Sequence, residues 1–266
     1  MDIRFRLEGP SDYYAVEELT RDAFWAFWEN DRLICDEHLL VHRLRQSSDF
    51  VPELSYIAEV GGKLAGHIAY SKSRVVDDMG NSHEMLTFGP ISVLPECQDK
   101  GIGMALMRHT FCIAQGLGYR AILIYGHPDY YPRVGFRRAS EFGITAPDGS
   151  SRDAFMALPL YDGALDGISG RYFICEAYEG LTQEDALAFD KKFPAKESHR
   201  PIPIGVLLDR LPDGARAAFA SLGCESLNMV ASKSEGEVLE LEGVDGNTIE
   251  AVRAVMRENG LRWGRG

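Results

Sequence analysis

The sequence lacks any long apolar segment. No run approaches the ~18 apolar residues that a membrane-spanning helix needs. The N-terminal residues MDIRFRLEGP also lack the apolar core of a signal peptide. We therefore expect a cytoplasmic protein that does not insert into a membrane.

Paired cysteines are absent as well. The five cysteines are scattered, odd in number and without a CxxC pair: Cys35, Cys97, Cys112, Cys175 and Cys224. This pattern gives little support to a disulfide framework or a zinc site, and it fits reduced thiols in a cytosolic protein. None of them has the His–Asn context of a covalent nucleophile. We expect no metal site and no covalent catalysis by a cysteine.

Basic residues are in deficit. There are 28 Lys and Arg against 40 Asp and Glu, so the formal net charge is −12. This balance argues against nucleic acid as the main partner. It does not exclude a phosphorylated cofactor, because backbone amides can bind phosphate groups without help from net charge.

The composition is that of a globular protein, with 45% hydrophobic and 26% charged residues over 266 positions. That length favours one large domain, or one domain with a smaller one. Apolar alternation and short apolar runs predict strands at residues 3–7, 56–60, 63–73, 83–94, 121–125, 142–145 and 154–159. Helical spacing predicts helices after Ser11 or Asp12 and over 36–46 and 101–115. These elements alternate irregularly, as in a mixed α/β (α+β) sheet.

Residues after about 160 differ from the preceding residues in their pattern of residue types. We predict three parts: a main domain over 1–160, an extension and linker over 161–200, and a small C-terminal α/β subdomain over 201–266. In the last part we expect helical stretches over 204–222, a hairpin over 227–241, and a final helix with Asn247 and Glu250 in capping-box spacing. The sequence assigns this subdomain no role.

The most informative stretch is LTFGPISVLPECQDKGIG, residues 86–103. It predicts a buried strand, a break, and a glycine-rich turn that opens an apolar helix. Such a turn presents backbone N–H groups and the helix N-terminus to an anion. A dinucleotide-binding turn is not supported, because Leu106 stands where G-x-G-x-x-G requires glycine. A P-loop is not supported either, because no G-K-[ST] follows.

Two motifs carry a family resemblance. Val93 to Gly103, V-x-P-x-x-Q-x-x-G-x-G, resembles motif A of the GNAT N-acetyltransferases. About thirty residues later, Tyr131 to Phe136 resembles the Y-x-x-x-G-F that ends their cofactor region. The double tyrosine Tyr130-Tyr131 and the motif G-P-[LI]-x-V-x-P, which begins at Gly89, resemble those of one subgroup of that family. The resemblance covers roughly residues 1–160.

The resemblance implies a fold and a co-substrate. It implies a mixed, mostly antiparallel sheet that splays at a central bulge, at Gly89-Pro90, and is flanked by helices. It also implies acetyl-CoA as co-substrate, with its pantetheine arm along the backbone of Ile91, Ser92 and Val93. The residues implied to bind the diphosphate are Gln98, Asp99, Lys100, Gly101, Ile102, Gly103 and Met104.

The implied reaction is direct attack of a neutral amine on the thioester, with an acid for the leaving thiolate. Tyr131 matches the family position of that acid; a purely structural aromatic is the alternative. Glu84, at the start of the central strand, is a candidate base, and a surface carboxylate or a water chain are alternatives. Further candidates for the base are His38, His83 and His127.

The acceptor stays open between a small-molecule amine and a protein amine. The aromatic residues Trp25, Phe27 and Trp28 form either core packing or a wall of the acceptor site. A second function class is a non-catalytic acyl-CoA-binding module whose C-terminal tail binds a partner. A homodimer is a further possibility that the sequence leaves open.

Overall fold

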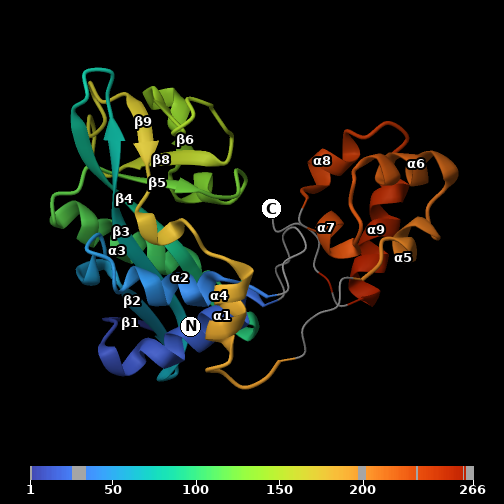
Figure 1. Ribbon diagram of the computed structural model, residues 1–266, viewed down its shortest axis with the longest axis horizontal. Helices are drawn as coiled ribbons and strands as arrows, with labels where there is room; N and C mark the ends of the chain where they lie inside the picture. Colours follow the sequence, from blue (N-terminus) through green and yellow to red (C-terminus); the bar gives the residue numbers. More distant parts are fainter. Residues whose placement is uncertain (1, 26–33, 197–201, 232, 260, 262–266) are drawn as a thin grey trace. The chain divides into compact units, whose positions relative to one another are not determined.

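The structure is a computed structural model that describes residues 2–25, 34–196, 202–231, 233–259 and 261 (Figure 1). The chain forms two compact units. The first comprises Met1–Phe24 and Asp36–Phe193, and the second comprises Trp25–Cys35 and Pro194–Gly266. No helix in the described part of the chain is both long and apolar enough to cross a membrane.

A nine-stranded sheet forms the centre of the first unit (Figure 1). Its strands are β1 Ile3–Leu7, β2 Tyr56–Val60, β3 Lys63–Val76, β4 Ser82–Val93, β5 Ala121–Tyr125, β6 Arg137–Arg138, β7 Ile144–Thr145, β8 Phe155–Pro159 and β9 Gly170–Phe173. The order is β1-β2-β3-β4-β5-β8-β6, while β9 pairs with β3 and β7. Only the β4–β5 and β7–β9 pairs are parallel. The predicted mixed, mostly antiparallel sheet is therefore confirmed.

Helices cover both faces of this sheet (Figure 1). Helix α1, Tyr13–Phe24, and helix α2, Glu37–Leu44, pack on Ile57. The next residue, Ala58, belongs instead to the cluster under α3, Ile102–Gly116. Because neighbouring residues of a strand point to opposite faces, α1 and α2 lie on one face and α3 on the other.

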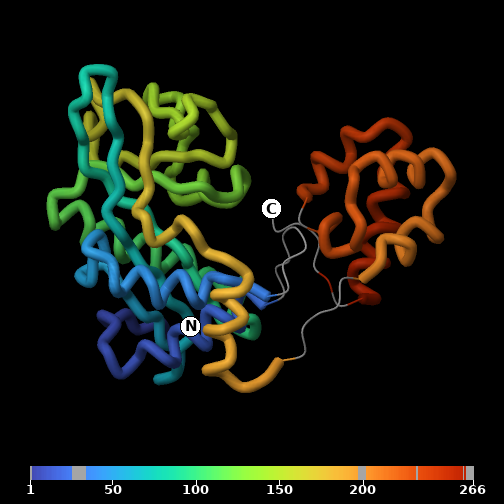
Figure 2. The backbone as a smooth tube through the Cα atoms, viewed as in Figure 1, coloured from blue at the N-terminus to red at the C-terminus, as the bar shows by residue number. Residues whose placement is uncertain are grey.

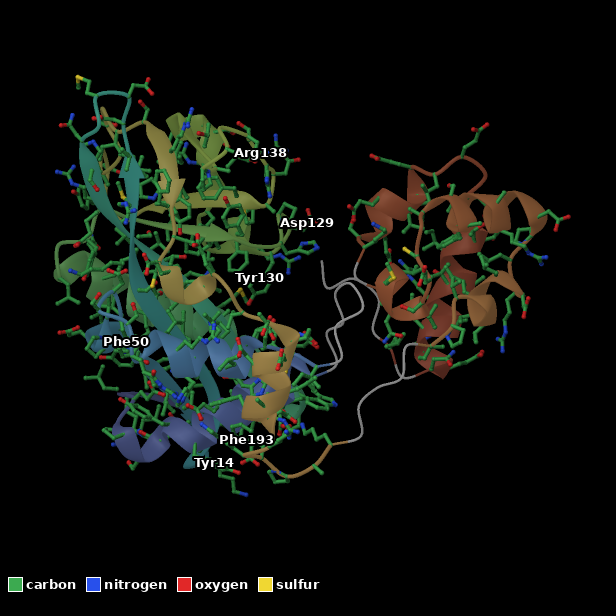
Figure 3. All side chains as sticks on the ribbon, viewed as in Figure 1. Tyr14, Phe50, Asp129, Tyr130, Arg138 and Phe193 are labelled. Carbon is green, nitrogen blue, oxygen red and sulfur yellow. The ribbon has the colours of Figure 1, made fainter. Side chains whose placement is uncertain are left out.

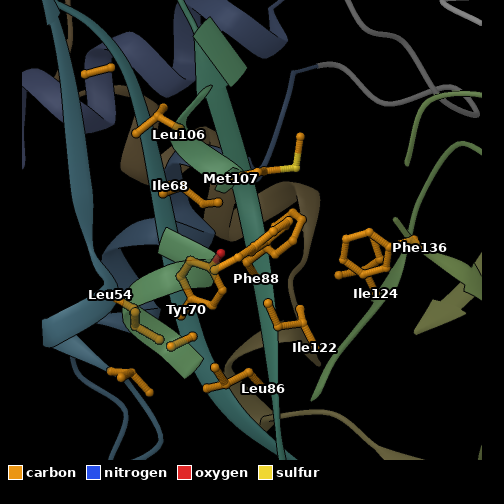
Figure 4. Close-up of a cluster of buried hydrophobic side chains, with 14 of the residues drawn as sticks. Leu54, Ile68, Tyr70, Leu86, Phe88, Leu106, Met107, Ile122, Ile124 and Phe136 are labelled. Atoms are coloured by element: carbon orange, nitrogen blue, oxygen red, sulfur yellow. The ribbon is translucent and has the colours of Figure 1, made fainter. Parts of the chain in front are cut away.

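Short 3-10 helices complete the first unit, at Pro10–Asp12, Pro52–Leu54, Pro95–Cys97, Tyr131–Val134, Ala139–Phe142 and Glu176–Tyr178. The main core lies between α3 and the sheet (Figure 4). In it Leu106 and Met107 of α3 pack with Leu86 and Phe88 of β4. This packing places the start of α3 beside the second half of β4, where the candidate site lies.

Residues 161–193 belong to the first unit, whereas the sequence placed the end of its first domain at residue 160. Helix α4, Gln183–Asp190, packs on α2. Asp190 accepts two hydrogen bonds from the buried Arg21 of α1, at 2.6 and 2.9 Å. Tyr14 of α1 also stacks on Phe193, with ring centroids 5.1 Å apart (Figure 3). These contacts join segments that are distant in sequence, which explains why residue order alone did not reveal them.

The second unit is helical in its described residues (Figure 2). Its helices are α5 Gly205–Leu208, α6 Asp213–Ser221, α7 Leu227–Ala231, α8 Glu235–Leu239 and α9 Gly246–Glu258. The predicted α/β character and the hairpin over 227–241 are therefore wrong, since α7 and α8 occupy that range. Ser234 and Glu237 form a capping box at α8, and Val230 and Val238 join a core around Phe219. Burial of this apolar face outweighs the alternation that suggested strands.

The final helix of the second unit is confirmed, but its predicted cap is wrong. Asp245, rather than Asn247, is the N-cap residue, and its carboxylate accepts a hydrogen bond from the Thr248 N–H at 2.8 Å. An acidic side chain at a helix start also interacts favourably with the helix dipole.

A buried ionic network connects β1 with α1, α2 and β3. The Arg45 guanidinium contacts Glu8 at 2.5 Å and Glu17 at 2.6 Å. Ser55 donates a hydrogen bond to Glu8 at 2.8 Å, and His67 Nε2 lies 3.5 Å from that carboxylate. Burial acts to raise the pKa of Glu8, but the interactions with His67 and Arg45 outweigh it and lower the pKa to about 2.

This network predicts acid sensitivity of the first unit. Because the pKa of Glu8 is lower in the folded chain than the ordinary value of 4.5 for a glutamate, its stabilising contribution is present above pH 4.5 and is lost as the pH falls toward 2. We expect a loss of about 3 kcal/mol in the free energy of unfolding over this window. Denaturant unfolding at a series of pH values measures it. Glu8→Gln should be less stable at neutral pH and should show a shallower decline; an unchanged slope would contradict the assignment.

Candidate active site

A bulge interrupts the pairing of β3 with β4. The ladder passes from Ile68–Ile91 directly to Tyr70–Phe88, so two residues of β4 oppose one of β3. The extra residues lie at Gly89-Pro90, whose peptide bond is cis. The predicted position of the bulge is confirmed. Proline is tolerated at a bulge because the bulged residues are left out of the ladder, so the N–H that proline lacks is not needed there.

Strands β4 and β5 separate beyond the bulge. Their parallel ladder holds a single pair, Leu86–Ile122, although β4 continues to Val93 and β5 to Tyr125. Among the strands that the structure describes, none pairs with this edge of β4 from Gly89 onward. Free backbone N–H and C=O groups on such an edge can pair with an extended ligand, as in β-strand addition.

The three residues predicted to contact pantetheine lie on this edge. The Ser92 side chain is buried on the α1 face, where its hydroxyl donates a hydrogen bond to Thr20 at 3.0 Å. Ile91 and Val93 point to the opposite face, toward Gly103 at the start of α3. Their side chains are thus committed to packing, so a ligand would pair with backbone groups; among these, the Val93 carbonyl already accepts a hydrogen bond from the Gln98 amide.

The turn after β4 presents two residues with positive φ. Asp99 has φ +61° and Gly101 has φ +79°, and α3 begins at Ile102. Aspartate is among the few residues that tolerate this region, and glycine adopts it without cost. Left-handed residues before a helix turn successive N–H groups toward one point, which makes a concave anion site. Diphosphate binding by this turn stays a prediction.

The side chains of two residues that were predicted to bind the diphosphate form hydrogen bonds that stabilise the turn. The Gln98 amide donates a hydrogen bond to the Val93 carbonyl at 2.9 Å, and the Lys100 ammonium donates one to the Glu96 carbonyl at 2.6 Å. Met104 packs against the main core. The sequence did not reveal this bracing, because a hydrogen bond from a side chain to a backbone carbonyl leaves no pattern in the residue order.

Tyr131 begins the 3-10 helix that follows β5, within an aromatic cluster. Its ring packs so closely on Gly126 that a Cβ added there would lie 2.2 Å from Tyr131 Cε2. Phe88 and Phe136 flank it, with ring centroids 6.0 and 5.7 Å away. Burial raises the pKa of Tyr131, and Tyr130 adds to the shift. The phenol is therefore a proton donor at neutral pH.

Tyr130 contacts both Tyr131 and the start of α3. Its ring is perpendicular to that of Tyr131, with centroids 5.2 Å apart. Its hydroxyl lies near Gly103, 3.3 Å from where a Cβ on that residue would be. The segment after β5, which Figure 3 shows at Asp129 and Tyr130, therefore contacts the first turn of α3. The structure brings the turn, the bulge and the tyrosine pair together.

Glu84 lies away from this assembly. It is exposed, and its carboxylate contacts Lys72 Nζ at 3.1 Å. It precedes Gly89 by five residues along β4, a separation of about 17 Å at about 3.3 Å per residue. Its predicted role as general base stays a prediction that no contact at the bulge supports.

The candidate histidines have other partners. His38 is buried 3.3 Å from Asp190, and burial is the main cause that lowers its pKa to about 4. His83 lies 3.3 Å from Asp77. His127 precedes the tyrosine pair and accepts a hydrogen bond from the Asp129 N–H at 3.3 Å. Of these three, only His127 lies in the segment that forms the splay.

Two further predictions concern the acceptor wall and metals. Phe27 and Trp28 lie outside the described residues, and so does most of the segment between α1 and α2. The described residues contain no group of His, Cys, Asp and Glu arranged to hold a metal ion.

One contact at the bulge was missed by sequence reasoning. The Tyr178 hydroxyl donates a hydrogen bond to the Gly89 carbonyl at 2.9 Å, across 89 positions of the sequence. Tyr178 lies in the extension over 161–200, to which the sequence gave no role in the site. A lone tyrosine there has no pattern that could have identified it.

Comparison with known proteins shows that these features lie in a region shared with a known family. A family model described as "Acetyltransferase (GNAT) family" matches residues 16–138. YjhQ of Escherichia coli K12, described as an uncharacterized N-acetyltransferase, is 31% identical over 144 residues, covering 54% of this chain and 75% of YjhQ. YhbS of the same strain, similarly described, is 28% identical over 166 residues, covering 62% of this chain and 92% of YhbS.

Solved structures agree with the sequence relatives. The chain superposes with a TM-score of 0.58 on YhbS from Escherichia coli in complex with CoA, at 25% identity, covering 68% of this chain and 93% of YhbS. It superposes with a TM-score of 0.53 on a GNAT family acetyltransferase from Brucella melitensis in complex with acetyl-CoA. That match has 27% identity and covers 67% of this chain and 99% of the other. The region matched by the family model contains the bulge, the turn and both tyrosines.

Proposed function

Because this chain belongs to the acetyltransferase (GNAT) family and is an N-acetyltransferase, we propose that it moves the acetyl group of acetyl-CoA directly to a primary amine. The amine belongs to a small molecule or a protein. The observation that carries the proposal is the convergence of the open β4 edge, the left-handed turn and Tyr131 at one splay.

Binding of the co-substrate follows from the free backbone groups. The edge of β4 at Ile91, Ser92 and Val93 pairs with the pantetheine arm as an added strand does. Backbone N–H groups from Asp99 to Met104, together with the start of α3, bind the diphosphate. Gln98 and Lys100 hold this turn in shape through the Val93 and Glu96 carbonyls.

The chemistry is a single displacement. The neutral amine attacks the thioester carbonyl, a C–N bond forms, and the C–S bond breaks. Tyr131 protonates the departing thiolate, and the proton of the amine leaves to a base or through water to the solvent. Supporting evidence is the raised pKa of Tyr131, caused first by burial, which keeps the phenol protonated.

The finer assignments belong to the same proposal. The double tyrosine and the G-P-I-S-V-L-P segment support the subgroup with G-P-[LI]-x-V-x-P. We propose further that the protein acts in the cytoplasm and that it forms a homodimer. Each needs its own measurement.

The proposal is tested by incubation with acetyl-CoA and a panel of primary amines, with detection of free thiol. We expect thiol release that depends on one class of amine, and acetyl-CoA binding detectable by calorimetry. Tight binding without turnover on any amine would favour a non-catalytic acyl-CoA-binding module. No binding at all would reject both.

Glu84→Gln tests the weakest part of the proposal. A general base contributes about 10²–10⁴-fold to the rate. Because Glu84 is exposed, paired with Lys72 and distant along β4 from Gly89, we expect kcat to change by less than about twofold, with water carrying the proton. Lys72→Met is the matched control for loss of the ion pair. A fall of 10²-fold or more in Glu84→Gln alone would establish Glu84 as the base.

A further inference from the structure

Tyr178 contacts the bulge from a segment that lies beyond the family-matched residues 16–138. Its hydroxyl donates a hydrogen bond to the Gly89 carbonyl at 2.9 Å. Its ring also lies along the same residue, 3.6 Å from where a Cβ on Gly89 would be. Tyr178 thus holds both the peptide group and the Cα of the residue that opens the sheet.

The contact restrains a residue with an unusual backbone conformation. Gly89 has φ +155°, a region that side-chain-bearing residues rarely adopt, and glycine loses more conformational freedom on folding than any other residue. The next residue, Pro90, has no N–H. The first backbone donor after the Gly89 carbonyl is therefore the N–H of Ile91, on the edge where β4 has left β5.

The orientation of one peptide group affects the next. Fixing the Gly89 carbonyl fixes the plane of the Gly89-Pro90 peptide, and the proline ring then restricts φ at Pro90. The direction of the Ile91 N–H follows from these two restraints. A hydrogen bond on the Gly89 carbonyl consequently determines where the bulge presents its nearest donor.

Tyr178 is itself held on both sides along the chain. Before it, Phe173 of β9 pairs with Arg74 of β3. After it, Arg43 of α2 donates hydrogen bonds to the Gly180 carbonyl at 3.2 Å and to Asp185 at 2.8 Å. Burial raises the pKa of Tyr178, so its hydroxyl stays a donor at all ordinary pH values.

We propose that Tyr178 is a positioning residue that orients the bulge, through Gly89, for the thioester carbonyl of acetyl-CoA. The inference rests on the proposed function, because it assumes that acetyl-CoA lies along β4. It gives Tyr178, in the segment that follows β9 and packs with α2, a role in that site. Tyr178 does not take part in the proton transfers.

The test compares Tyr178→Phe with Tyr172→Phe. Tyr172 is a fully buried tyrosine of β9 in the same segment, and it packs with Val75 and Phe155. Tyr178→Phe loses a hydrogen bond and should lower the melting temperature. The Tyr172 hydroxyl is buried without a hydrogen-bond partner among the described residues, so Tyr172→Phe should leave the melting temperature unchanged or slightly raised. Of the two residues, Tyr178 alone contacts the bulge, so Tyr172→Phe controls for the loss of a buried hydroxyl in this segment.

The readout is the preference for acetyl-CoA over CoA, measured by calorimetry. We expect Tyr178→Phe to weaken acetyl-CoA binding about tenfold, which corresponds to about 1.4 kcal/mol, and to weaken CoA binding less than twofold. The reason is that only acetyl-CoA carries a thioester carbonyl. Tyr172→Phe should leave both affinities within about twofold of the wild type.

Three outcomes would overturn the inference. Unchanged affinities in Tyr178→Phe would show that the hydrogen bond does not matter to the ligand. An equal loss for acetyl-CoA and CoA would show a structural role only. A wild-type protein that binds neither would overturn this inference and the proposed function together. Normal binding with no turnover would reject only the proposed function, since the affinity comparison can still be made.

Discussion

Replacement of Tyr131 by phenylalanine is expected to lower kcat by about 10²–10³-fold and to leave acetyl-CoA affinity within about twofold. The aromatic ring, with its contacts to Gly126, Phe88 and Phe136, stays in place. Only the proton donor for the thiolate is lost. Initial rates at saturating acetyl-CoA, together with calorimetric affinity, measure the two effects separately.

The pH dependence gives an independent check on Tyr131. Burial raises the pKa of this phenol above its usual value, so its acid form persists to higher pH than that of a free tyrosine. We therefore expect no loss of wild-type activity from this group below about pH 10. A fall in activity that begins near neutral pH, and that disappears in Tyr131→Phe, would contradict this.

Two other variants make the Tyr131 result specific. Tyr125→Phe changes a more exposed tyrosine at the end of β5 that stacks on Phe155, and it should keep full activity. Tyr130→Phe tests the neighbour. If Tyr130→Phe abolished turnover while Tyr131→Phe did not, the acid would be Tyr130, whose hydroxyl lies near Gly103.

Replacement of Gly126 by alanine is expected to lower kcat by about 10–10²-fold, although it leaves the chemical identity of every reacting group unchanged. The new methyl would lie 2.2 Å from Tyr131 Cε2 and 2.5 Å from Cδ2, so the ring has to move. A displacement of about 1 Å at a catalytic group can cost about 10²-fold. The overlap should also lower the free energy of unfolding by about 1–3 kcal/mol. Steady-state kinetics and denaturant unfolding measure both.

Non-additivity distinguishes displacement of Tyr131 from general damage. If alanine at 126 acts through Tyr131, the variant Gly126→Ala/Tyr131→Phe should be no slower than Tyr131→Phe alone. Gly116→Ala, at the end of α3, is the matched control, because a Cβ there meets no atom within 4 Å. Multiplied losses in the double variant would show that Gly126 affects the rate by another route.

Local motifs in the sequence were sufficient to predict the strand, the bulge and the helix around which the candidate site is built. Gly89-Pro90 predicted the bulge because a proline inside a strand excludes regular pairing, and the β3–β4 register confirms it. The apolar strands and the helix after Gly101 were likewise recognisable from period and composition. These features depend on neighbouring residues, and neighbouring residues are what a sequence displays.

Other features were ambiguous or invisible at that level. Leu227 to Leu241 shows apolar residues that fit either period, and burial around Phe219 selected helices. The ion-pair partner of Glu84 is Lys72, which lies on the neighbouring strand β3. Side-chain partners from other strands cannot be read from residue order, because the register that joins them is a property of the folded sheet.

The chain by itself determined the strand, the bulge and the glycine turn from Leu86 to Gly103, and the tyrosine pair that follows β5. Only the tertiary structure decided that Tyr131 rests on Gly126, and that Tyr178 reaches Gly89 from a segment outside the motifs. The physical reason is the range of the interactions. Backbone preferences act between neighbours, whereas packing and hydrogen bonds at the splay join residues that only the folded sheet brings into contact.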